Sequence, residues 1–495
     1  MDTAIEALFR SGFELGERQN SRRTMLDTFD GRLHAAGMRL EHRADGVGGE
    51  LVLTATGTIP ARVAAAAMPR WAADVSRGPF RARLAPVLEM RALRPQLTFA
   101  DTWQTAVGRD RTGKTVVSLL VHDAIGEVPW SIEIVRQPGH AAAAQRAVDL
   151  LIGLGFDPVA DDFAGAVMSA SGVDQRGYRD SPTVPMSPDQ PAWTGWRDVL
   201  VNLAESARAN WQGTIDDTDT EFLHDLRVAL RRSRSILSQA RDVLPSSLRE
   251  PFGDELRWLA GVTGPTRDLD VYILEWDRYT ADLTDPSRDA LQPVLQHLRD
   301  RRDRARADLV AAMRSERGAT LLDSWTAALS ALHEPTAGDA PKANEEIGDV
   351  VAARIHRTHQ RLLDDGRAID ADTAAERLHE LRKDAKKLRY LVECFASLIP
   401  KGIRTKFVKQ MKSLQDNLGE HQDAEVHSAE IHVVATELSG EHATRSTLVA
   451  LGQLSQQLDA TKARARGEFA ARFDDFDSKR TAKVIDSMLD ALRAP

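Results

Sequence analysis

The chain has 495 residues, which is too long for a single hydrophobic core and predicts two or three domains. Hydrophobic residues make up 42% and charged residues 28% of it, as in an ordinary globular protein with enough apolar mass to bury. The single cysteine, Cys394, excludes an intrachain disulfide and a thiolate metal cluster. The formal net charge of −8 gives only the sum, because a local field depends on where the charges lie.

The first twenty residues, MDTAIEALFRSGFELGERQN, do not have the pattern of a targeting signal. They are acidic where a secretory signal peptide would be basic, and they lack a continuous apolar segment. No apolar run elsewhere approaches the roughly 20 residues that a membrane-spanning helix needs. We therefore expect a cytoplasmic protein with no membrane partner.

The first 140 residues carry short segments with the alternation of β-strands, separated by turn-prone glycines. These segments are residues 23–29, 37–43, 49–57, 98–107, 114–123 and 129–135. A helical pattern follows at 140–155. Residues 171–193 are rich in proline, serine, glycine and aspartate, which is typical of an exposed linker. The sequence thus predicts a β-rich domain over residues 1–165, followed by this linker.

After the linker the hydrophobic period is that of helices, and the helical half contains a repeat. Shifted by 155 positions, residues 224–271 align without a gap on residues 379–426, and eleven of the 48 positions are identical. The helical half, about 195–490, is therefore predicted to hold two related bundles that face each other about a pseudo-twofold axis. Their expected bounds are about 195–335 and 345–490. The whole chain is expected to be an α+β multidomain protein.

A basic helix face occurs in both copies of the repeat. At 100° per residue, four side chains of the first copy fall within roughly 80° of each other. They are His224, Arg227, Arg231 and Arg234. The same face in the second copy consists of His379, Arg382, Lys386 and Arg389, with Lys383 close by. Like charges at this spacing repel by about 0.2–0.5 kcal/mol per pair, so a face built twice indicates a shared, densely anionic ligand.

The sequence around the two faces narrows the class of ligand. Aromatic side chains that could stack on bases are not interleaved with the cations, since Phe252 and Trp258 occupy apolar, core-like positions. No helix-turn-helix or RNA-binding signature appears, so we do not expect nucleic acid as the partner. Charge-assisted hydrogen bonds to phosphate-like oxygens remain, for which the planar guanidinium group of arginine is well suited.

Six histidines lie between positions 356 and 432 of the second bundle, but no metal-binding spacing accompanies them. They are His356, His359, His379, His421, His427 and His432. We expect no metal and no cofactor. For the two leading histidines of the basic faces, a hydrogen bond at a helix start remains the alternative to an anion contact.

The doubled motif, HDLRVALRRSR…LAGVTGPTRDLDV and HELRKDAKKLRY…LQDNLGEHQDAEV, resembles the two halves of a CHAD domain, a histidine-headed α-helical domain. The resemblance implies an all-α domain of two pseudosymmetric four-helix bundles that binds inorganic polyphosphate, in a granule-associated or scaffold protein. The implied ligand residues are His224, Arg227, Arg231, Arg232, Arg234, His379, Arg382, Lys383, Lys386, Lys387 and Arg389, supported by Arg249, Arg257, Arg404 and Lys412. Asp268 and Asp423 are expected to cap or orient helices.

The N-terminal half carries a second resemblance. Residues 22–43 resemble the strand–turn–strand of CYTH-type triphosphate tunnel enzymes, and residues 108–123 resemble a later hairpin of that fold. This implies an antiparallel, CYTH-like sheet. Those enzymes need an opening Glu-x-Glu-x-Lys strand and paired glutamates to hold divalent metals around a triphosphate. The chain begins without such a strand and keeps only Glu133 in WSIEIV, so we expect a catalytically degenerate domain.

Three functions remain open from the sequence. The first is a polyphosphate-binding module. The second is a metal-dependent triphosphatase or polyphosphatase that uses the N-terminal domain. The third is a binder of nucleic acid or of an acidic protein. For the first, we expect that only long chains reach both basic faces at once, with an effective-concentration gain on the order of 10²–10⁴ over tripolyphosphate.

Overall fold

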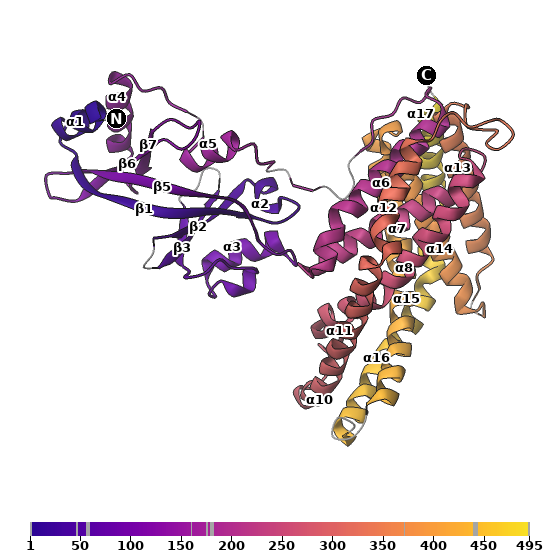
Figure 1. Ribbon diagram of the computed structural model, residues 1–495. Coiled ribbons are helices and arrows are strands. Elements are labelled where there is room, and N and C mark those ends of the chain that lie inside the picture. The colour runs from indigo at the N-terminus through magenta and orange to yellow at the C-terminus, as the bar shows by residue number, and fades with distance from the viewer. Residues whose placement is uncertain are drawn as a thin grey trace. The chain divides into compact units, whose positions relative to one another are not determined.

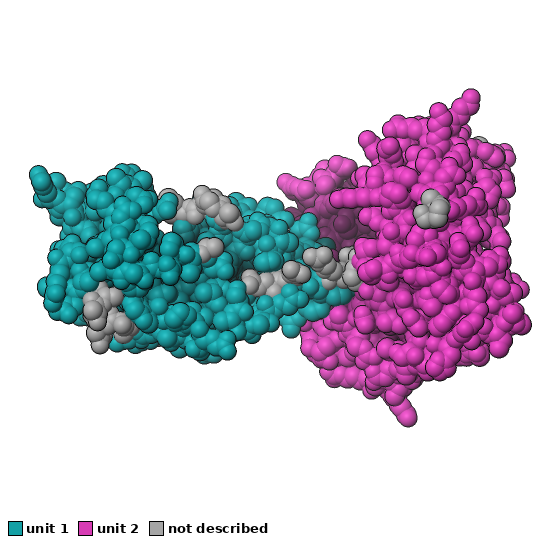
Figure 2. Space-filling model, turned by 90° about the horizontal axis from the view of Figure 1, so that it is seen from above, with its two compact units in different colours: residues 1–178 teal, residues 179–495 magenta. Residues whose placement is uncertain are grey.

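The computed structural model divides the chain into two compact units, residues 1–178 and 179–495 (Figures 1 and 2). The structure describes residues 2–45, 48–55, 60–159, 161–174, 177–178, 183–370, 372–438 and 444–493. Unit 1 contains a sheet and unit 2 is helical, which confirms the expected α+β multidomain organisation (Figure 1).

Unit 1 is built on a seven-stranded antiparallel sheet with the strand order β4-β3-β2-β1-β5-β6-β7. The strands are β1 (Glu14–Asp27), β2 (Met38–Ala44), β3 (Gly49–Ala55), β4 (Ala61–Ala64), β5 (Arg94–Arg109), β6 (Thr115–His122) and β7 (Ser131–Arg136). The six expected strands are present, although positions 56 and 57 of the third lie outside the described residues. The first strand begins earlier than expected, at Glu14, because its exposed, polar first half carries no apolar alternation.

Helices pack on this sheet through separate apolar clusters. They are α1 (Asp2–Arg10), α2 (Arg32–Ala35), the 3-10 helix η1 (Ala72–Asp74), α3 (Pro79–Leu88), α4 (Ala141–Gly153) and α5 (Phe163–Ala170). Leu8 of α1 and Leu151 of α4 pack with Leu119 of β6, whereas Leu84 of α3 packs with residues of β2 and β3. The helix expected at 140–155 is α4, whose apolar face bears on this sheet.

The segment expected as a linker is attached at both of its described ends. Tyr178 stacks on Phe29 of unit 1, with ring centroids 5.2 Å apart. At the other end, the carbonyl of Pro188 accepts a hydrogen bond from the Gly348 N–H at 3.0 Å, within unit 2. Positions 175–176 and 179–182 lie outside the described residues.

Unit 2 consists of helices that repeat along the chain. They are α6 (Ala192–Ile215), α7 (Thr220–Gln239), α8 (Ser246–Leu274), α9 (Trp276–Tyr279), α10 (Asp285–Ala290), α11 (Gln292–Arg314), α12 (Glu316–Ser330), α13 (Ile347–Arg367), α14 (Ala375–Cys394), the 3-10 helix η2 (Ala396–Leu398), α15 (Lys401–Glu437), α16 (Arg445–Phe476) and α17 (Lys479–Arg493). The helices α6, α7 and α8 begin 155 residues before α13, α14 and α15. The repeat that the sequence predicts is therefore a repeat of helices.

Two reciprocal backbone hydrogen bonds mark the pseudo-twofold relation. The Ala192 N–H donates to the carbonyl of Glu345, and the Ile347 N–H donates to the carbonyl of Gln190, each at 2.9 Å. Both donors and both acceptors are 155 positions apart in the sequence, so each bond is the image of the other under the repeat. The two copies face each other, as expected.

The basic helices α7 and α14 are held by the apolar stripes on their opposite sides. In α7, the Asp219 side chain caps the helix by accepting from the Glu221 and Phe222 N–H groups, at 3.0 and 3.2 Å. Apolar residues of both stripes, and of the turns that follow the two helices, are buried in one shared core. They are Leu223, Leu226, Leu230, Leu237, Leu244, Leu378, Leu381, Leu388, Val392 and Phe395. Burial of these stripes leaves the basic faces outside the core.

The expected count of four helices in each bundle differs from the structure. Among the described residues, each repeat contributes five helices of at least 15 residues, because α12 and α17 return to pack against α6 and α13. Both are amphipathic and bury leucines, such as Leu329 and Leu489, in the core that the two repeats share. None of the described helices is long and apolar enough to cross a membrane.

Candidate anion-binding cavity

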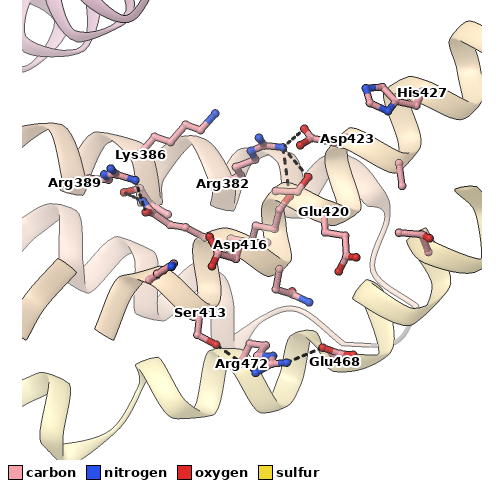
Figure 3. Close-up of a pocket in the computed structure, with 18 of the residues that line it drawn as sticks. Arg382, Lys386, Arg389, Ser413, Asp416, Glu420, Asp423, His427, Glu468 and Arg472 are labelled. Atoms are coloured by element: carbon pink, nitrogen blue, oxygen red, sulfur yellow. Dashed lines mark hydrogen bonds and ion pairs between the residues drawn. The ribbon is translucent and has the colours of Figure 1, made fainter. Parts of the chain in front are cut away.

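A basic cavity of about 1300 Å³ opens in unit 2, lined by α7, α9, α14, α15 and α16 (Figure 3). Ten lysine and arginine side chains line it, against six aspartate and glutamate side chains. The cations are Arg231, Arg232, Arg278, Arg382, Lys386, Arg389, Lys409, Lys412, Arg464 and Arg472. The cavity therefore gathers positive charge within a protein whose net charge is negative.

The two repeated faces meet in this one cavity. Seven of the fifteen ligand residues expected from the sequence line it. They are His224, Arg231, Arg232, Arg382, Lys386, Arg389 and Lys412. Because α7 packs against α14, the faces are two walls of one space. A short anion can therefore approach both, and the expected advantage of long chains stays a prediction.

Arg227 and Arg382, which correspond in the repeat, are fixed by hydrogen bonds. The Arg227 guanidinium donates to the carbonyl of Ala260 and to the Thr263 hydroxyl on α8, both at 3.0 Å, and lies 4.0 Å from Asp268. Arg382 donates to the Gly419 carbonyl and to the Asp423 carboxylate on α15, both at 3.2 Å (Figure 3).

The aspartates of the repeat thus orient the arginines. The sequence predicts that Asp268 and Asp423 cap or orient helices; the structure pairs each of them with the arginine of the neighbouring helix. A glycine stands four residues before each aspartate, where an added Cβ would make only ordinary van der Waals contact, at 3.5 Å from the Arg227 guanidinium for Gly264. One repeated unit of arginine, glycine and aspartate is built on each side of the axis.

Arg231 and Lys386, the next cations of each face, have no such partners. Within the described residues, neither side chain makes a hydrogen bond or an ion pair, and the Nε atom of Arg231 is buried without a partner. Figure 3 draws Lys386 without a contact, beside the tethered Arg382. Burial, together with the charges of Arg382 and Arg231, lowers the pKa of Lys386 to about 8. Two cations without a hydrogen bond or ion pair in the described structure therefore share the cavity.

Arg232 and Arg389 are bridged by one carboxylate. Glu393 accepts from Arg232 at 3.0 Å on one oxygen and from Arg389 at 2.5 Å on the other. Arg389 also donates to the Gln415 side chain at 3.2 Å. Because Arg232 comes from α7 and Arg389 from α14, this bridge ties the two repeats together at the wall of the cavity.

The structure places the other expected ligand residues outside the cavity lining. Arg227 contacts α8 as described above, and Arg234 is exposed. Arg249 and Arg404 donate to the backbone carbonyls of Leu244 and Ala396, at 2.9 and 3.0 Å, in the segments that join α7 to α8 and α14 to α15. Three of the remaining four pair with a carboxylate three residues away, namely Arg257 with Asp254, Lys383 with Glu380 and Lys387 with Asp384, whereas His379 hydrogen-bonds Gln422 on α15.

Several lining residues were not found from the sequence. The cations among them are Arg278, Lys409, Arg464 and Arg472. Lys409 lies on the α15 face that continues through Ser413 and Asp416, a spacing of three and four residues that was visible in the sequence. Arg464 and Arg472 lie on α16, beyond the aligned part of the repeat, so the comparison of the two copies could not reveal them.

Carboxylates on the cavity wall hold the α16 cations in place. Glu420 pairs with Arg464 at 2.5 Å, and Glu468 pairs with Arg472 at 2.9 Å. The phenol of Tyr279 and the imidazole of His427 lie 3.4 Å apart on the same wall, with the rings also packed against Tyr272. The arrangement provides fixed cations around a solvated space.

The family assignment follows from this geometry together with a sequence comparison. Residues 199–432 match the model of the CHAD domain family. The helical unit contains a CHAD domain. The match spans the first helices of both repeats and therefore both basic faces, including Arg231 and Lys386.

Two sequences of Mycobacterium tuberculosis, each described as an uncharacterized protein, are 26% identical to this chain over 361 residues. The matched part covers 70% of this chain and 64% of the length of those relatives. Among solved structures, the CHAD domain of the plant Ricinus communis is 23% identical, with a TM-score of 0.46, and the match covers 64% of this chain and 98% of that one. PptA from Streptomyces chartreusis is 20% identical, with a TM-score of 0.46, over 57% of this chain and 99% of that one.

Unit 1, preceding the CHAD domain, carries a buried network of charged residues across its sheet. Its antiparallel strands are consistent with a CYTH-like domain. Arg23 of β1 donates to Glu41 of β2 at 2.6 and 3.0 Å and to Asp101 of β5 at 2.9 Å. His122 of β6 lies 3.0 Å from Asp101 and 3.5 Å from Glu133 of β7. These carboxylates are therefore already paired with protein cations.

The network shifts the titration of its members. Burial by itself would raise the pKa of Glu41, but the charges of Arg23 and Arg43 outweigh it and hold the pKa below its usual range. Burial would lower the pKa of His122, but the hydrogen bonds and charges of Asp101 and Glu133 raise it. The ring of Phe163 on α5 stacks on His122 with centroids 4.2 Å apart, which covers this part of the sheet.

The histidines of the second repeat do not form a metal site. Across the described residues, no group of three or more histidine, cysteine, aspartate or glutamate side chains is placed to hold an ion. His359 is buried against Phe476, and burial lowers its pKa to about 4. His432 hydrogen-bonds the backbone carbonyl of Ser428 at 2.7 Å, within its own helix.

Proposed function

We propose that the CHAD domain binds inorganic polyphosphate in the cavity between its two repeats. The observation that carries the proposal is the pair Arg231 and Lys386, two corresponding cations that share the cavity with no protein partner among the described residues. An unsatisfied buried donor costs about 1–3 kcal/mol, and a phosphate oxygen would satisfy it. The resemblance of the motif to polyphosphate-binding CHAD domains supports the same ligand.

The chemistry of the walls fits a chain of phosphates better than a single small anion. Cations from five helices surround a space of about 1300 Å³, so several phosphate groups can be contacted at once. The guanidinium groups donate in a planar fork that matches phosphate oxygens. Glu393, Asp423 and Glu468 each pair with an arginine of the lining, and so they position the donors around the chain.

The cellular place of the protein follows from the ligand in this proposal. A chain that holds polyphosphate through a non-catalytic cavity would join polyphosphate granules in the cytoplasm, as a granule-associated or scaffold protein. Hydrolysis is assigned to neither unit, since the carboxylates of the N-terminal sheet are paired with Arg23 and His122.

The test is a titration of the whole protein with polyphosphates of defined length, alongside ATP and duplex DNA at one salt concentration. We expect polyphosphate to bind most tightly, and its affinity to fall steeply with salt because each ion pair with the polymer releases counterions. Duplex DNA or an acidic peptide binding as tightly as polyphosphate would contradict the proposal and favour the third function.

A further inference from the structure

A second group of cations lies where α17 begins beside α15, outside the cavity lining. We call Lys406, Lys479, Arg480 and Lys483 the α17 platform. With Gln410 and Val484 they line a hollow of about 470 Å³ that has no carboxylate in its lining. All four side chains are exposed, and none has an ion pair or a hydrogen bond in the part of the chain that the structure describes.

The platform continues the cavity along one helix. On α15, Lys406 is followed at three-residue steps by Lys409 and Lys412, which line the cavity. Each step rises about 4.5 Å along the helix axis and turns about 60° around it, so the three lysines form a short track that winds along α15. At the same end of the cavity, Arg472 of α16 reaches the Ser413 hydroxyl at 3.5 Å (Figure 3).

The track belongs to one repeat only. At the shift of 155, the positions of Lys406 and Lys409 are occupied in the first repeat by Pro251 and Asp254. The fold therefore does not require cations there, since the equivalent helix α8 forms with a proline and a carboxylate. The second repeat therefore carries lysines at these two positions of α15, whereas the first repeat carries a proline and an acidic residue at the corresponding positions of α8.

The platform also carries an unrelieved electrostatic cost. Lys479 and Lys483 are four residues apart on α17 and repel each other, which costs about 0.2–0.5 kcal/mol. Lys479 and Arg480 stand in the first turn of α17, where the positive end of the helix dipole disfavours cations. An anion on the platform would relieve both effects.

We propose that the α17 platform is a second anion subsite, which holds the part of a polyphosphate chain that leaves the cavity along α15. This inference rests on the proposed function, and it explains how the protein would prefer long polyphosphate chains to short ones. Tripolyphosphate fits within the cavity and reaches both repeated faces there. Only a longer chain extends past Lys409 to the platform, and the linked contacts then add to its affinity.

The test compares a platform variant with a matched control. The platform variant carries Lys479→Ala, Arg480→Ala and Lys483→Ala; the control carries Arg299→Ala, Arg314→Ala and Arg445→Ala. The control positions are exposed cations that line neither the cavity nor the platform. Both variants lose three positive charges, so a general change in field affects them alike. Circular dichroism melts verify that each variant is folded.

We expect the platform variant to bind long polyphosphate about tenfold more weakly than the control, a modest part of the gain that linked sites give. For the platform variant, the slope of log affinity against log salt concentration should fall in magnitude by about one for each phosphate that the platform no longer binds. Its affinity for tripolyphosphate should equal that of the control. Lys406→Glu repeats the test from α15 without touching α17. Long-chain affinity equal to the control in both variants overturns the inference alone. No binding of any polyphosphate by the unaltered chain overturns the proposed function as well.

Discussion

At the scale of single residues, the repeat separates two roles that look identical in the sequence. Arg227 and Arg382 are fixed against the neighbouring helix by a carbonyl and an aspartate, whereas Arg231 and Lys386, four residues later, are unpaired in the described structure. Of the two fixed arginines only Arg382 lines the cavity, whereas both unpaired cations line it and are available to a ligand. The leading histidines also differ, because His379 hydrogen-bonds Gln422, which stands where the first copy has Arg267.

Lys386 makes polyphosphate affinity depend on pH. Burial and two neighbouring arginines lower its pKa to about 8, well below the ordinary value for lysine. An anion favours the charged amine, so binding is strongest below pH 8 and weakens as the lysine loses its proton at higher pH. We expect the affinity for polyphosphate to fall between pH 7 and pH 9.5, and protons to be taken up on binding near pH 8. Titration calorimetry in buffers of differing ionisation enthalpy measures both quantities.

Lys386→Arg provides the control for this prediction, because arginine keeps its charge across the same range. The variant should bind over the whole range without the loss at high pH, and any titration of the polyphosphate itself would remain visible in it. An identical pH profile for the variant and the unaltered protein would show that Lys386 does not titrate on binding.

At the scale of helices and strands, the contact of α7 with α14 decides the geometry of binding. The sequence presents two basic faces, and the packing turns them into two walls of one cavity. We therefore expect a length preference to come from cations beyond the cavity, and α15 provides them. This is why the α17 platform, and not the second repeated face, is expected to distinguish long chains from short ones.

The strands of unit 1 lead to a prediction about catalysis. Glu41 and Asp101 both bind Arg23, and Glu133 lies by His122, so a divalent metal would have to displace protein cations. We expect no phosphate release from tripolyphosphate above background, with magnesium or manganese, in a malachite-green assay. Turnover that disappears in Glu133→Gln would contradict this. That position suits the test because its side chain is 34% exposed, whereas Glu41→Gln would leave Arg23 poorly paired in the buried network.

At the scale of the whole molecule, the sequence predicts the order and type of the two halves correctly. The repeat at a shift of 155 is directly visible as His224 over His379 and Arg227 over Arg382, and it identifies the helices that form the cavity. The contacts that the sequence does not predict also have a physical explanation. No local pattern shows that Arg464 on α16 returns to the cavity, because its pairing with Glu420 of α15 depends on the packing of distant segments.

The two units have separate cores, which predicts that the helical unit folds without the N-terminal sheet. Bounds of 195–490 would remove Ala192 and Leu492, which are 0% and 1% exposed in the core. A fragment of residues 183–493 keeps both. We expect this fragment to show cooperative thermal unfolding and to bind polyphosphate with the affinity of the full chain. A folded, helical fragment that binds at least tenfold more weakly would assign part of the site to unit 1.

The central claim is that the unpaired cations of the two repeats bind one polyphosphate chain together. Its most direct measurement is the affinity of the variant Arg231→Ala, Lys386→Ala for polyphosphate, beside Arg299→Ala, Arg314→Ala as a control of equal charge. Removal of two charge-assisted hydrogen-bond donors should weaken binding on the order of 100-fold, at the low end of the about 1.5–3 kcal/mol expected for each. The melting temperature should not fall, since neither side chain has a protein partner in the described structure. An affinity equal to that of the control would show that the cavity is not the binding site.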